Sequence, residues 1–150
     1  PDTYFNGKDL GNLIKNHKPG TISWGVGSEL PSMDHYFGLI VDESNGAVLG
    51  DTKLNWREGG NFGELKHYVK GAINIFDPNI FMELLLAFKN ECQKSYPIDL
   101  YWDILPYIEE KNYFNVLSGR QSILQAITFK NPIIDYGTVE GLEFTRRVYS

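Results

Sequence analysis

The strongest constraint on the fold is a single helical pattern that begins at Asp77-Pro78 and ends near Lys94. Aspartate accepts hydrogen bonds from the free N–H groups of a first helical turn, and proline suits the first helical position. The apolar residues that follow recur at helical spacing: Ile80, Phe81, Leu84, Leu85, Phe88 and Cys92, with Met82 and Leu86 beside them. A stripe this broad predicts that the helix, about residues 78–94, lies at the centre of the hydrophobic core.

Strand patterns come before this helix. Residues 36–41 and 47–50 are rich in β-forming residues and flank a polar segment that ends in Asn45-Gly46. An Asn-Gly pair between two apolar runs favours a hairpin, because both residues tolerate a positive φ. Residues 21–26 alternate as a strand does, and residues 65–76 predict one strand or two short ones.

Further elements are predicted near both ends of the chain. They are a helix at 8–17, a helix at 103–111 with Pro106 in its first turn, a helix from Ser118 to about Phe129, and a half-buried strand at 142–149. Hairpins and helices are thus mixed, rather than alternating as βαβ units. The pattern predicts an α+β fold in which a mainly antiparallel sheet with hairpins packs against the central helix, with two or three further helices. A chain of 150 residues suits one domain, 1–150.

The charges are sorted into blocks. Residues 19–52 hold five acids and residues 95–110 hold four, and neither block contains a Lys or Arg. Nine of the 19 acids therefore lie in two blocks, which leaves ten acids beside all 14 bases in the rest of the chain. Blocks of negative charge repel nucleic acid and anionic membranes, and they attract a basic partner at long range.

The second acidic block is also aromatic, and it supplies the main candidate binding site. Trp and Tyr are favoured at interface hot spots because they bury a large rigid area and keep a polar group. We expect one contact region at Asp99, Tyr101, Trp102, Asp103, Glu109 and Glu110, and a second acidic site at Asp34, Asp42 and Glu43. Under the alternative interpretation, the aromatics cover the core between helices and the acids cap helix ends.

One enzymatic alternative comes from Asp51, Glu64 and Lys66. Their spacing resembles the metal-dependent nucleases of the PD-(D/E)xK type, and the resemblance implies Mg²⁺-assisted hydrolysis. Gly50 stands where that family has proline, and the match covers 16 residues. The simpler interpretation is a turn acid followed by an exposed cross-strand pair.

The remaining candidates for chemistry are weaker. The three histidines share no metal-ligand spacing, and a lone Cys92 excludes an internal disulfide and a cysteine zinc site. We therefore expect no catalytic residue, cofactor or metal. The sequence holds no run of 18 apolar residues, and its start is neither basic nor apolar, which favours a cytoplasmic protein. A secreted chain whose signal had been removed would carry the same sequence.

An acidic, cysteine-poor chain of this length, with an acid-rich aromatic segment at 99–103, resembles the bacterial immunity proteins of contact-dependent inhibition and related polymorphic-toxin systems. The resemblance is one of type and brings no residue roles with it. It implies an inhibitor that covers the active site or docking surface of a basic toxin domain, such as a nuclease, without cofactor or turnover. A phage or accessory structural subunit, whose aromatics form an assembly surface, is a further alternative. The sequence fixes neither the partner nor the oligomeric state.

Overall fold

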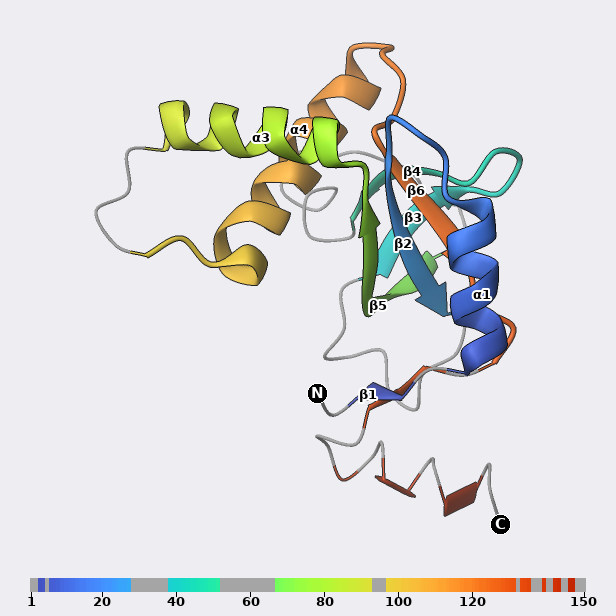
Figure 1. Cartoon of the computed structure of the whole chain (residues 1–150). Coiled ribbons are helices and arrows are strands. Elements are labelled where there is room, and N and C mark those ends of the chain that lie inside the picture. Colours follow the sequence, from blue (N-terminus) through green and yellow to red (C-terminus); the bar gives the residue numbers. More distant parts are fainter. Residues whose placement is uncertain are drawn as a thin grey trace.

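A computed structural model describes residues 3–4, 6–27, 38–51, 67–92, 97–131, 133–135, 139, 142–143 and 146–147. Its elements, in chain order, are β1 (Thr3–Tyr4), α1 (Gly7–Asn16), β2 (Ile22–Gly27), β3 (Gly38–Asp42), β4 (Ala47–Asp51), β5 (His67–Phe76), α3 (Pro78–Glu91), the π-helix η1 (Leu100–Ile104), α4 (Leu105–Leu117), β6 (Leu124–Thr128) and β7 (Ile134–Asp135) (Figure 1). The predicted α+β class is confirmed.

The main sheet curls into a closed barrel with the strand order β2-β5-β3-β4-β6. Its β2–β5, β5–β3, β3–β4 and β4–β6 pairs are antiparallel, whereas β6 closes the barrel by pairing parallel to β2. The mainly antiparallel sheet is therefore confirmed, as is the β3–β4 hairpin. In the hairpin turn Gly46 has a φ of 77°, whereas Asn45 does not have a positive φ. The short strands β1 and β7 pair separately from the barrel.

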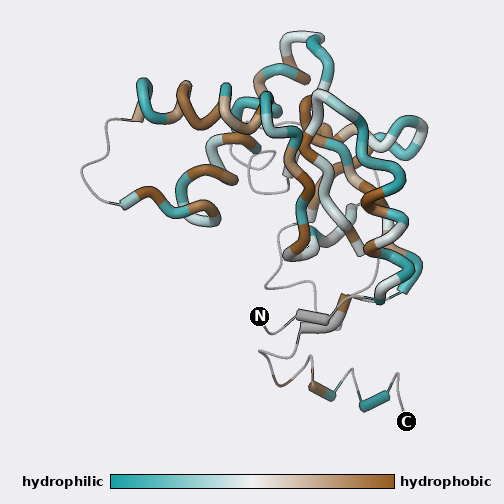
Figure 2. The backbone as a smooth tube through the Cα atoms, in the orientation of Figure 1, coloured by the Kyte–Doolittle hydropathy of each residue, from teal (hydrophilic) through white to brown (hydrophobic). Residues whose placement is uncertain are grey.

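Helices cover the barrel on two sides (Figure 1). On one side α1 packs through Leu13, which shares a buried cluster with Phe129 and Ile133. On the other side α3 crosses α4, and the rings of Phe88 and Tyr107 meet edge to face at 5.2 Å. Figure 2 shows hydrophobic residues along the barrel strands and along α3 and α4, and hydrophilic residues at the turn between β3 and β4.

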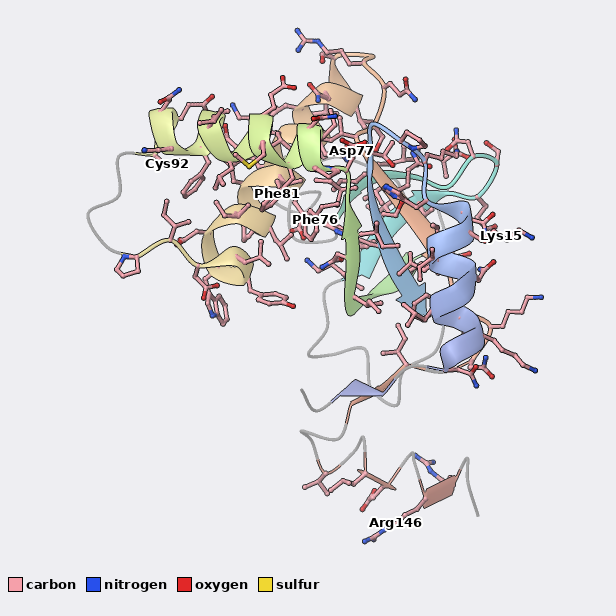
Figure 3. The ribbon with its side chains drawn as sticks, in the orientation of Figure 1. Lys15, Phe76, Asp77, Phe81, Cys92 and Arg146 are labelled. Atoms are coloured by element: carbon pink, nitrogen blue, oxygen red, sulfur yellow. The ribbon has the colours of Figure 1, made fainter. Side chains whose placement is uncertain are left out.

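The start of α3 is the one predicted. The Asp77 carboxylate accepts hydrogen bonds from the backbone N–H groups of Asn79 at 2.9 Å and Ile80 at 3.3 Å, and Pro78 occupies the first turn. A third backbone N–H, that of Gly20, donates to the same carboxylate at 2.9 Å and ties the helix start to the chain before β2. Figure 3 shows Asp77 at the junction of β5 and α3, with Phe76 and Phe81 close together beside it.

The apolar stripe of α3 is half-buried, and the centre of the core lies under α4 instead. Within α3 the buried residue is Phe88, while Met82 and Leu86 are exposed. Helix α4 buries Leu105, Tyr107, Ile108, Asn112 and Tyr113. The reason is positional, because α4 lies directly against β4 and supplies residues to the buried cluster, whereas the half-buried apolar residues of α3 pack on the outside of that cluster.

The prediction of a helix from Ser118 to about Phe129 is wrong. Ser118 ends α4, and Gly119 follows with a φ of 74°. The Gly119 N–H donates to the Val116 carbonyl and the Arg120 N–H to the Asn115 carbonyl, which is the Schellman pattern of a helix end. Residues 124–128 then form β6, because pairing with β2 satisfies the backbone of both strands.

The predicted strand at 142–149 is also wrong wherever the structure describes it. Leu142, Glu143, Arg146 and Arg147 are helical and exposed. An alternating pattern becomes a strand only where a sheet edge receives it, and the barrel is already closed by β2 and β6. Figure 3 shows Arg146 well away from the barrel.

Candidate functional site

The most exposed apolar side chains of the predicted contact region lie together in residues 97–104, which we call the aromatic turn. Trp102 is 85% exposed and Tyr101 is 55% exposed, and Ile98 and Leu100 beside them are also exposed. The turn leads into α4 at the left-hand edge of the molecule in Figure 1, away from the barrel. Neighbouring large apolar side chains in water are typical of an interaction surface.

Two aspartates hold the aromatic turn in shape: Asp99 caps the backbone of Tyr101 and Trp102, and Asp103 caps the backbone of Asp99. The Asp99 carboxylate accepts hydrogen bonds from the N–H groups of Tyr101 at 2.7 Å and Trp102 at 2.8 Å. In return the Asp99 N–H donates to the Asp103 carboxylate at 3.0 Å. The arrangement resembles a capping box, widened by one residue because the first turn is a π-helix.

Asp103 therefore has a different place from the one predicted. It is 7% exposed and its carboxylate faces the chain itself, so it is a cap rather than part of the outer surface. The alternative interpretation of the sequence is thus right for Asp103. It does not fit Tyr101 and Trp102, which are exposed instead of covering the core, whereas Tyr107 is buried against Phe88.

The two predicted glutamates differ in their surroundings. Glu109 forms an ion pair with Lys70 of β5, with 2.5 Å between Oε1 and Nζ. The Lys70 Nζ also lies 4.4 Å from the ring centroid of the buried Trp24. Glu110 is exposed. The charge of Glu109 is therefore balanced by a base, and Asp99 is the acid that directly contacts the segment of Tyr101 and Trp102.

An ion pair next to the aromatic turn joins α3 to α4. The Lys111 Nζ lies 2.8 Å from the Glu91 carboxylate and 5.2 Å from the ring centroid of Tyr107. The hydrogen bond to Glu91 raises the pKa of Lys111 above its ordinary value, and burial raises the pKa of Tyr107. This ion pair is exposed to solvent, so the packing of Phe88 on Tyr107 is the main contact between the two helices.

The second predicted acidic site lies far from the aromatic turn, at the opposite edge of the molecule in Figure 1. Asp42 accepts hydrogen bonds from the Ser44 side chain and backbone and from the Asn45 side chain. These bonds, those from Ser44 first, lower the pKa of its carboxyl. Glu43 is exposed and accepts a hydrogen bond from the Tyr68 hydroxyl. Asp34 lies outside the described residues. The structure does not join the Asp42 and Glu43 site to the aromatic turn.

The structure does not describe the geometry of the enzymatic alternative. Asp51 is the last residue of β4, and Glu64 and Lys66 lie outside the described residues. Within the part of the chain that the structure describes, no three His, Cys, Asp or Glu residues gather as a metal site would require. Cys92 packs against the core from the end of α3, as predicted from its place on the apolar stripe.

Sequence reasoning missed two features of the site. Ile98 and Leu100 extend the exposed apolar surface, and neither was among the predicted contact residues. Lys70, which pairs with Glu109, was also missed. The four-residue separation of Asp99 and Asp103 was the available signal that the Asp103 carboxylate accepts the Asp99 N–H.

None of the described helices is long and apolar enough to cross a membrane. No family model matches the chain, and neither does any curated protein sequence.

Proposed function

We propose that the protein is a non-enzymatic inhibitory binding protein of the immunity type. It would neutralise a basic toxin domain, and the toxin activity we propose for that domain is that of a nuclease. It would act in the cytoplasm, without cofactor or turnover, by covering the toxin's active site or docking surface. The observation that carries this proposal is the exposure of Trp102 and Tyr101 next to the exposed Asp99, in a segment (residues 95–110) that contains no base.

Exposed aromatics supply the affinity in this proposal. A tryptophan that is 85% exposed contributes little to the stability of the folded chain, because most of its surface stays in water. The same side chain becomes favourable when a partner covers it, and tryptophan is the residue most enriched at interface hot spots. Ile98 and Leu100 enlarge the area that a partner would bury.

The carboxylates determine the specificity for a basic partner. Asp99 caps the turn that carries the aromatic side chains, and the block of residues 95–110 contains no base. Such a field raises the association rate of a positively charged partner and disfavours an acidic one. Toxins that act on nucleic acid carry basic clefts for their substrate, so their charge is complementary to this surface.

The experiment that tests the proposal has two stages. The tagged chain is used to capture proteins from the source cell's lysate at low salt, and capture by Trp102→Ala and Leu117→Ala variants is compared. Leu117 is a matched control, because it is 55% exposed like Tyr101 but lies at the other end of α4. Helix α4 alone spans about 18 Å between Leu105 and Leu117, and the aromatic turn precedes it.

The captured basic protein is then expressed in cells with and without this chain. We expect capture to be lost with Trp102→Ala and kept with Leu117→Ala, and the captured protein to stop growth unless this chain is present. A captured protein that is harmless, or whose toxicity this chain does not relieve, contradicts the proposal.

A further inference from the structure

We infer that Trp102 is a rigid anchor that enters a preformed apolar cleft with a basic rim on the partner, and that Asp99 and Asp103 are positioning residues that hold it ready. The inference rests on the proposed function and adds to it the shape of the partner's site. It also gives the two aspartates a structural role, in addition to the charge that Asp99 presents to the partner.

Rigidity of the aromatic turn follows from the bonds around Asp99. Its carboxylate accepts two backbone N–H groups, its own N–H donates to Asp103, and its carbonyl accepts the N–H groups of Asp103 and Ile104 at 3.1 and 3.2 Å. Five hydrogen bonds therefore converge on one residue. The backbone that carries Tyr101 and Trp102 is ordered before any partner arrives.

The buried residues that follow Trp102 also hold the aromatic turn in place. Directly after the exposed residues 100–102 come Asp103, Ile104 and Leu105, all of them buried. Ile104 and Leu105 belong to the main hydrophobic cluster together with barrel residues, so movement of the turn would disturb the core. Trp102 is thus an exposed side chain on a fixed base.

A fixed, projecting aromatic side chain fits a concave partner site better than a flat one. Binding then costs the ordering of side chains alone, since the backbone has already lost its freedom. The exposed Asp99 carboxylate, next to Trp102, would meet a cation at the rim of that cleft. A cleft with an apolar floor and a basic rim is what an enzyme offers to a polyanionic substrate. The inference therefore selects the active site over a remote docking surface.

Two variants of Asp99 separate positioning from charge. Asparagine still accepts the N–H groups of Tyr101 and Trp102 as a cap but carries no charge, whereas alanine removes both. We expect Asp99→Asn to weaken binding less than about threefold, with a loss that disappears at high salt. We expect Asp99→Ala to weaken binding tenfold or more at every salt concentration.

The first measurement needs no partner. Backbone hydrogen exchange at the N–H groups of Tyr101 and Trp102 is followed by NMR in the free wild-type chain and in both Asp99 variants. Protection in the wild type and in Asp99→Asn, and its loss in Asp99→Ala with the rest of the spectrum unchanged, supports the positioning role. Free exchange in the wild type overturns the rigid anchor.

The second measurement uses the basic protein recovered with the wild-type chain, assayed as a nuclease on a fluorescent oligonucleotide. We expect inhibition to be competitive with the oligonucleotide and lost with Trp102→Ala. Neutralisation that is noncompetitive overturns this inference and leaves the proposed function standing, whereas neutralisation unchanged with Trp102→Ala removes the observation on which both depend. A recovered protein that is not toxic defeats the proposed function instead, while the exchange data still report on the turn.

Discussion

Asn112 of α4 and Val48 of β4 are joined by a buried hydrogen bond of 2.8 Å from the side-chain Nδ2 to the carbonyl oxygen. The Oδ1 atom of the same side chain accepts the Ile123 N–H at 2.8 Å and the Ser122 hydroxyl at 2.9 Å. One amide thus attaches the helix below the aromatic turn to β4 and to the chain that enters β6.

Replacing Asn112 by alanine removes this attachment. We expect Asn112→Ala to lower the free energy of unfolding by about 2–4 kcal/mol, because the Ile123 N–H loses its acceptor inside the protein. Urea denaturation measures the change. The control is Asn90→Ala on the exposed surface of α3, for which we expect a change within about 0.5 kcal/mol. Equal effects of the two substitutions would show that the buried amide contributes no special stability.

A second prediction concerns the close approach at Gly25 of β2. A Cβ at this position would lie 2.1 Å from the Phe129 Cζ, far inside contact distance. We expect Gly25→Ala to destabilise the protein by about 1–3 kcal/mol, and the cost to shrink when Phe129→Ala is also present. Thermal unfolding of the two single variants and the double variant gives the coupling energy.

Gly11 on α1 is the matched control for this change. A Cβ there meets nothing within 4 Å, and alanine is the better helix former. We expect Gly11→Ala to raise the free energy of unfolding by about 0.5–1 kcal/mol. A loss of stability at Gly11 as large as that at Gly25 would argue against a local steric cause.

The third prediction is a pH dependence that comes from Asp9. Burial alone would raise the pKa of this carboxyl, but hydrogen bonds from the Asn131 side chain and from the Lys130 and Asn131 backbone, together with the Lys130 charge, lower it below its ordinary 3.8. A lowered folded-state pKa stabilises the protein above the unfolded value, and this stability is lost as the pH falls through the folded value.

We therefore expect Asp9→Asn to cost about 2–3 kcal/mol at pH 7, since three donors lose a charged acceptor. The difference between wild type and Asp9→Asn should begin to shrink as the pH falls below about 4, where Asp9 of the unfolded chain takes up a proton, and it should vanish only where the folded carboxyl is protonated as well. Urea denaturation at pH 7 and pH 3 measures both differences. Glu83→Gln, at an exposed position on α3, should show neither effect.

The fourth prediction is that Trp102 contributes to binding without contributing to folding. Because this side chain is exposed, we expect Trp102→Ala to change the free energy of unfolding by less than about 0.5 kcal/mol. Ile108→Ala, at a fully buried position on α4, should cost about 2–5 kcal/mol. Guanidinium denaturation compares them, and a large loss with Trp102→Ala would assign the tryptophan to the fold.

Local signals explain which elements could be predicted. The start of α3 depends on Asp77 and Pro78 alone, and the β3–β4 hairpin depends on a turn of four residues, 43–46. The end of α4 was mistaken for a helix start because serine suits both kinds of helix end, and the deciding feature was the positive φ of Gly119. Barrel closure lies beyond local patterns, since no periodicity shows which strand edges meet.

For the candidate site, the sequence predicted the segment but not which of its side chains are exposed. Trp102 and Tyr107 are both aromatics among acids, yet one is exposed and the other is buried against Phe88. The π-helix before α4 shifts the direction of successive side chains, so ordinary helical spacing cannot assign them. For the same reason the burial of Asp103 was not predicted, since it depends on how α4 packs against the rest of the fold.

The parallel pairing of β2 with β6 also has a consequence for the order of folding. Ile22 and Leu124 are neighbours in the barrel although they lie roughly 100 positions apart in the chain, and contacts this distant in sequence form slowly. During synthesis the edge of β2 must wait until nearly the whole of this stretch has emerged. A nascent chain that stops before residue 124 would present that unpaired edge to its neighbours, where aggregation begins.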